Sequence, residues 1–114
     1  MIEEMIKRAF EIRNAAHVQH WKTKSYSEHK TLGHFYEDVI DTVDKFVESY
    51  QGGVELIGDI EGVDPATIKM IEEEMLWIAK NRAELAKGAP ALENILDDLV
   101  GMYARTLYRL ENLR

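Results

Sequence analysis

Four side chains between residues 20 and 48 are of the types that bind transition-metal ions in proteins. Imidazole nitrogens and carboxylate oxygens are the usual ligands for iron, zinc and related ions in sites without sulfur. The chain has no cysteine, so it has neither disulfides nor thiolate metal sites. Two of the four are acids one helical turn apart, where both side chains share a helix face. The candidate metal ligands are His20, His29, Asp44 and Glu48.

These four residues cannot meet within one chain. A helix predicted over residues 28–51 would hold His29 and Asp44 fifteen positions apart, which is about 22 Å along its axis. Metal–ligand bonds are only about 2.0–2.2 Å long. A second copy, antiparallel through the same helix, would bring its Asp44 and Glu48 level with His20 and His29 of the first. A two-fold axis would then generate two equivalent sites, so we expect a dimer at least.

The apolar residues predict an all-α chain. They recur at intervals of three and four, as on one face of an α-helix, and no stretch alternates as a strand would. Asp64-Pro65 is typical of a helix start, Gly52-Gly53 of a helix end, and Pro90 of a restart after Gly88. Four amphipathic helices predict a single four-helix-bundle domain over residues 1–114. The predicted helices span residues 1–23, 28–51, 65–87 and 90–113.

The link between the second and third predicted helices is long enough to cross the bundle. A helix of about 22 residues is about 33 Å long. The stretch from Gly52 to Asp64 is about 13 residues and can reach about 43–47 Å when extended. A long crossover of that kind gives the ferritin-like topology. An up-down-up-down bundle with a loose loop is the alternative.

Length and charge narrow the function classes. At 114 residues with a net charge of −7, the chain lacks the basic surplus by which proteins neutralise nucleic-acid phosphates, so we expect DNA binding to be weak. Its acidic, periodic start is unlike a signal peptide, and no apolar run could span a bilayer. We therefore expect a cytoplasmic protein with no membrane partner.

The metal-ligand stretch resembles the mini-ferritins, the Dps family. His20-Trp21, a short loop, His29 at the opening of the next helix, and Asp44-x-x-x-Glu48 follow the family pattern, and Tyr36 and Val43 also match. The segment from Leu96 to Leu110 is similar more weakly. The resemblance implies a ferroxidase at a two-fold subunit interface, in which His20 and His29 of one chain and Asp44 and Glu48 of its partner hold iron.

The implied activity is oxidation of Fe(II) by peroxide or O₂, with zinc as a surrogate metal. A dodecameric cage would add iron storage. The sequence departs from the family pattern in a shorter loop after His20, in Gly33 where the family often has a further acid, and in a crossover without an evident helix.

One other function fits the same residues, and a third would require a pattern that they lack. The chain could be a non-catalytic helical assembly module that forms the same interface without metal. A single-chain carboxylate protein with its metals in the core would need Glu-x-x-His pairs, and none occurs. Taken singly, His20 is typical of a core histidine and Asp44 with Glu48 of a solvated face. His17 is a candidate supporting group for the site, and His34 a surface residue.

Overall fold

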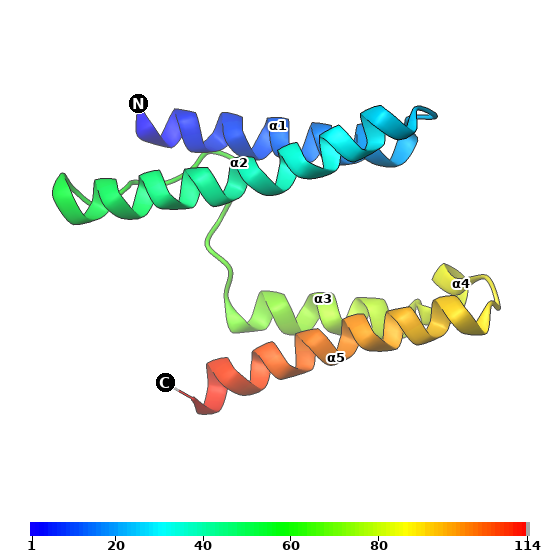
Figure 1. Cartoon of the computed structure of the whole chain (residues 1–114). Helices are drawn as coiled ribbons and strands as arrows, with labels where there is room; N and C mark the ends of the chain where they lie inside the picture. Colours follow the sequence, from blue (N-terminus) through cyan, green and yellow to red (C-terminus); the bar gives the residue numbers. More distant parts are fainter. Residues whose placement is uncertain (114) are drawn as a thin grey trace. The chain divides into compact units, whose positions relative to one another are not determined.

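The computed structural model describes residues 1–113, and its regular elements are all helices (Figure 1). The predicted all-α class is therefore confirmed. By internal contacts the chain divides into two compact units, the first being Met1–Asp64 and the second beginning at Pro65. No helix within residues 1–113 is long and apolar enough to cross a membrane. The helices are α1 (Ile2–Lys22), α2 (Tyr26–Gly53), α3 (Ile68–Lys80), α4 (Arg82–Ala86) and α5 (Pro90–Asn112).

The first unit is an antiparallel hairpin of α1 and α2 (Figure 1). Ser25 caps α2, because its hydroxyl accepts a hydrogen bond from the Glu28 N–H at 3.2 Å. The short turn before it, Thr23 to Ser25, places the end of α1 beside the start of α2. The buried residues of the hairpin all belong to α1, and the 28-residue α2 has none. The buried set is Ile2, Ile6, Ala9 and Ala16.

The segment after α2 differs from the predicted extended crossover. It folds back along α1, where the Gly58 N–H donates to Glu3 at 3.0 Å and Glu61 pairs with Lys7 at 3.5 Å. A tight turn closes the segment, with Gly62 at a φ of 82° and a backbone bond from Val63 to Ile60. The sequence indicated that the link was long enough to run the length of a bundle. In the structure, side chains of α1 instead hold it against the first hairpin. The predicted lack of a helix here is confirmed.

The third predicted helix is wrong in its start and in its continuity. The helix begins after Thr67 and not after Asp64, because the Thr67 hydroxyl accepts the Met70 N–H at 3.1 Å. It ends at Asn81, whose backbone N–H and side-chain amide both donate to the Trp77 carbonyl, at 3.0 and 2.8 Å. The predicted helix over 65–87 is therefore two helices, α3 and α4.

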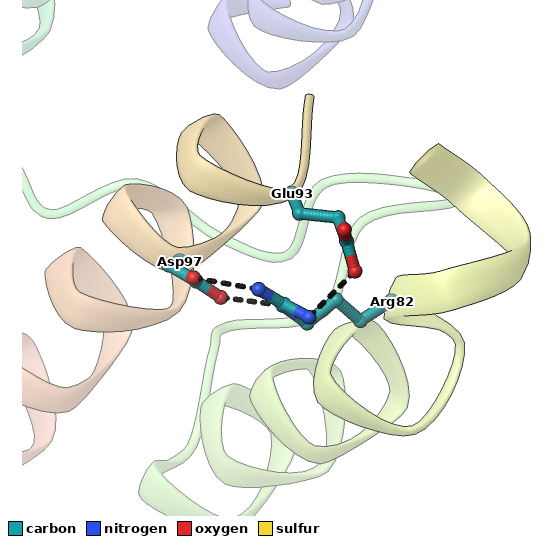
Figure 2. A network of polar contacts seen from close by, with 3 residues as sticks. All are labelled: Arg82, Glu93 and Asp97. Carbon is teal, nitrogen blue, oxygen red and sulfur yellow. Dashed lines mark hydrogen bonds and ion pairs between the residues drawn. The ribbon is translucent and has the colours of Figure 1, made fainter. Parts of the chain in front are cut away.

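In the second unit, α3 and α5 run antiparallel, and α4 is braced against α5 by one arginine (Figures 1 and 2). Arg82 makes a two-point contact with Asp97, with N–O distances of 2.7 and 2.9 Å, and a third bond of 2.7 Å to Glu93. The Arg82 hydrogen bonds lower the pKa of Asp97. The predicted start of the last helix is confirmed, with Pro90 at its first position.

Candidate metal site

His20 and His29 contact each other where the end of α1 meets the start of α2. Their rings are stacked, with centroids 3.7 Å apart and an angle of 16° between the planes. Nδ1 of His20 lies 2.5 Å from the His29 carbonyl oxygen, and Nδ1 of His29 lies 2.7 Å from the His20 carbonyl oxygen. Each ring thus binds the backbone of the residue that carries the other, and both histidines are half-buried. The sequence prediction that the short turn brings them together is confirmed.

The two hydrogen bonds determine which ring nitrogen is free to bind a ligand. A carbonyl oxygen only accepts, so each Nδ1 must carry the hydrogen. In the neutral ring, Nε2 of His20 and of His29 then keeps its lone pair. A histidine that donates one ring N–H to a carbonyl and offers the other nitrogen is oriented as metal-binding histidines usually are. Both residues therefore have the tautomer that a metal ion requires.

The stacking restricts how the pair can bind. A metal ion lies in the plane of the imidazole that holds it, and these planes are nearly parallel. An ion in the plane of one ring is consequently out of the plane of the other. The pair thus suits one ion for each ring, or a single ion after one ring has turned.

Gly33 makes room for the His20 ring. A Cβ at this position would lie 3.2 Å from Cε1 and 3.4 Å from Nδ1 of His20. The first distance is shorter than ordinary van der Waals contact and the second lies at its lower limit. A side chain at position 33, such as the acid that the family resemblance would place there, would require the His20 ring to shift.

A second stack beside the pair was not foreseen from the sequence. The His17 ring lies on Tyr36, with centroids 3.9 Å apart and an angle of 15°, and Trp21 covers His17 at 4.1 Å. The Arg13 guanidinium lies 5.1 Å from the Tyr36 ring centroid. Desolvation, and secondarily the charges of Arg13 and His20, lower the pKa of His17. Spacings of four along α1 among Arg13, His17 and Trp21 were the available signal.

An open groove of about 330 Å³ gives access to the pair. Tyr36 stands edge-on to His20, with centroids 5.4 Å apart, and separates this groove from a second one that Arg13 and Asp41 line. His34 is exposed, as predicted, and lies on the groove wall. The groove is lined by His20, Tyr26, His29, Lys30, Gly33, His34, Tyr36 and Glu37.

The two predicted carboxylate ligands lie elsewhere on α2. Asp44 and Glu48 are exposed, and the helix is unbroken between them and His29. His29 and Asp44 are therefore about 22 Å apart along the helix axis. Within residues 1–113, no three histidine, aspartate or glutamate side chains gather closely enough to hold a metal ion. The structure brings His20 and His29 together and leaves both acids distant from them.

Comparison with known proteins gives one family and one curated relative. Residues 20–110 match a family of unknown function, DUF5856. The relative is the uncharacterized 14.6 kDa protein in the mobD-ri intergenic region of Enterobacteria phage T4, which is 30% identical over 99 residues. The match covers 82% of this chain and 75% of the phage protein. No solved structure matches this chain.

These matches overturn the resemblance to the mini-ferritins. The family that matches has no assigned function and the phage relative is uncharacterized, so neither supports a Dps or ferritin-like assignment. The His-Trp and Asp-x-x-x-Glu spacing was not specific enough to identify a family. Gly33, where the mini-ferritins often have a further acid, departs from that pattern.

Proposed function

We propose that this chain, which belongs to the DUF5856 family of unknown function, binds transition-metal ions through Nε2 of His20 and His29. The observation that carries the proposal is the reciprocal pair of bonds from each Nδ1 to the other residue's carbonyl. These bonds orient both rings and leave Nε2 of each without the hydrogen, and both residues line an open groove. Two imidazoles without sulfur suit Fe(II), Zn(II) and neighbouring divalent ions.

A second copy of the chain completes the ligand set in this proposal. One imidazole nitrogen leaves most coordination positions of each divalent ion unfilled, and carboxylates are a ligand type that α2 of a second copy can add. Asp44 and Glu48 are exposed and one turn apart. An antiparallel dimer through α2 would bring these acids of one chain to the histidines of the other, and its two-fold axis would give two equivalent sites.

The reaction we propose is oxidation of bound Fe(II), which is the substrate. Two Fe(II) ions lose one electron each, and one hydrogen peroxide takes both electrons with two protons to give two waters. The chain's part is to hold the ions at neutral imidazoles and to neutralise the added charge with the partner's carboxylates. O₂ is the alternative oxidant. Storage of the ferric product would require a closed cage.

Anaerobic titration tests the binding step. Adding Fe(II) or Zn(II) under argon should raise the melting temperature, because an ion that binds only the folded chain stabilises it. His20→Ala and His29→Ala should each remove most of the rise. The control is His34→Ala. His34 also lines the groove, but within residues 1–113 no hydrogen bond orients its ring as the backbone carbonyls orient those of His20 and His29. Equal stabilisation of all variants, or none in the natural chain, would overturn the proposal.

The oxidation step has its own measurement. Fe(II) with peroxide should give ferric absorbance in a fast phase that Glu48→Gln and His29→Ala abolish. If the chain binds the metal but shows no fast phase, the proposed binding site stands and the proposed oxidation is overturned. If the natural chain and all variants oxidise Fe(II) no faster than buffer alone, the proposed reaction is likewise overturned.

A non-catalytic assembly module is the second candidate, and one observation favours it. The whole of α2 lacks a buried residue, and its Phe35 and Phe46 are 42% and 52% exposed. Apolar side chains at that exposure call for a covering surface. We propose that the exposed apolar side chains of α2 are covered in an assembled four-helix bundle. Sedimentation without metal, which should show a stable assembly, and an unchanged melting temperature on metal addition would favour this candidate.

A further inference from the structure

The turn end of the first hairpin has a charge unlike that of the rest of the chain. Residues 17–34, here called the hairpin tip, hold three lysines and one glutamate, a formal charge of +2 with neutral histidines. The whole chain carries −7, so the remainder carries −9. Side-chain charges act over about 8 Å at physiological salt. The formal charge of the tip is thus opposite in sign to that of the rest of the chain, and Glu37, just beyond it, lines the same groove as Tyr26 and Lys30.

Two exposed aromatic rings stand on the hairpin tip. Trp21 is 68% exposed and Tyr26 is 77% exposed, at the end of α1 and the start of α2 (Figure 1). Lys22, Lys24 and Lys30 are also exposed. Exposed aromatic rings can stack with planar groups, and lysines near them in the sequence favour an anionic ligand.

Both rings are held in place from below. Trp21 lies on His17, which lies on Tyr36, so the tryptophan is the outer plate of a stack. Tyr26 lies at 6.5 Å and 25° from His29, which is itself stacked on His20. A plate that is already fixed loses little conformational entropy when a planar ligand stacks on it. The tip thus offers two ordered aromatic surfaces between lysines.

The tip's one acid does not cancel this arrangement. Glu28 accepts a hydrogen bond from Gln19 at 2.8 Å, which draws it to the side chain of α1. Within residues 1–113 no carboxylate lies within 4.0 Å of Lys22, Lys24 or Lys30. Those three ammonium groups remain available to phosphates.

We propose that the hairpin tip binds single-stranded nucleic acid, with bases stacked on Trp21 and Tyr26 and phosphates beside Lys22, Lys24 and Lys30. Aromatic plates within a basic surface are how proteins bind unpaired strands without sequence preference. The low affinity for duplex DNA that the net charge predicts still stands, because bases inside a duplex cannot stack on the plates. The proposal does not depend on metal binding.

Fluorescence tests the stacking. In a Trp77→Phe background Trp21 is the sole tryptophan, and a twelve-nucleotide oligothymidine should quench its emission. Trp21→Ala and Tyr26→Ala should each weaken binding about tenfold by anisotropy of a labelled strand. Circular dichroism of each variant establishes that the helices remain, and because the two plates lie on different stacks, one variant can be read if the other unfolds.

Salt dependence tests the lysines. Three phosphate contacts on a single strand give a slope of roughly −2 in log affinity against log salt, so raising salt from 50 to 150 mM should weaken binding about tenfold. Changing all three tip lysines to Gln should remove that slope. The matched control changes Lys69, Lys80 and Lys87 of the second unit to Gln, the same loss of charge, and should keep it. Absence of quenching by the single strand, or equally tight binding of a duplex, would overturn the proposal. A change of Trp21 emission with protein concentration in the absence of any nucleic acid would also overturn it.

Discussion

Gly33 lies against the ring of His20, with an added Cβ at 3.2 Å from its Cε1. The contact joins two elements, since Gly33 belongs to α2 and His20 to α1. The His20 ring that lies against position 33 is the ring that contacts the His29 carbonyl. A backbone position in the middle of a helix, where glycine is otherwise unfavourable, is thereby tied to the geometry of the candidate site.

We expect Gly33→Ala to destabilise the chain despite the higher helix propensity of alanine. The added methyl would push His20 off its carbonyl partner, and loss of one such bond costs about 0.5–1.5 kcal/mol. Urea unfolding measures the change. Gly52→Ala is the matched control, because a Cβ there meets nothing within 4 Å and should stabilise α2 by up to about 1 kcal/mol. Equal effects at the two glycines would contradict the contact.

We expect Thr67→Ala to cost about 0.5–2 kcal/mol, the usual loss for a helix cap. Its hydroxyl accepts the Met70 N–H at the start of α3. Asp64→Ala is the comparison, since the sequence alone named Asp64 as the cap and the structure does not. Chemical denaturation of both variants should rank Thr67→Ala as the more harmful; the opposite order would restore the predicted start.

The brace between Arg82 and Asp97 should make stability depend on pH in the acid range. Arg82 lowers the pKa of Asp97 below its ordinary value of 3.8, so the carboxylate's contribution is present above that value and is lost as the pH falls through the folded pKa. We expect Arg82→Gln to be less stable than the natural chain at pH 6. The gap should narrow as the pH falls below 3.8. A gap that stays constant down to pH 2 would argue against the ion pair.

His17 should titrate below its ordinary value of 6.5, because burial in the stack opposes its charged form. With the folded pKa lowered, the unfolded chain binds the proton first as pH falls, so the stack's stability is full above pH 6.5 and declines below it. NMR titration of the four histidines measures this directly. His17→Phe keeps a flat ring without a proton site and should remove that part of the decline. A His17 pKa at or above 6.5 would contradict the expectation.

Local sequence patterns predicted the helices well and their interruptions poorly. The spacing of apolar residues gave α1, α2 and α5 to within a few residues, and Pro90 marked a helix start. The break at Asn81 is a local change of the backbone, with a φ of −98° and a ψ of 11°, which no periodicity reveals. The position of the crossover likewise depends on Glu3 and Lys7, more than fifty residues earlier in the chain.

The proximity of His20 and His29 was predictable from the sequence, and the geometry of their contact was not. A short turn between α1 and α2 was enough to bring His20 and His29 together. The exchange of backbone bonds depends on the rotation of each helix and on the space at Gly33. The partnership with Asp44 and Glu48 remains a prediction, because it concerns a second copy of the chain.

The crossed bonds of His20 and His29 have a mechanical consequence for the hairpin. His29 donates to a carbonyl in the final turn of α1, where helical carbonyls lack partners of their own. A cation on the far nitrogen makes the ring N–H a stronger donor, which pulls the two helix ends together. Occupancy of the imidazoles should therefore slow hydrogen exchange of the amides around the turn between α1 and α2.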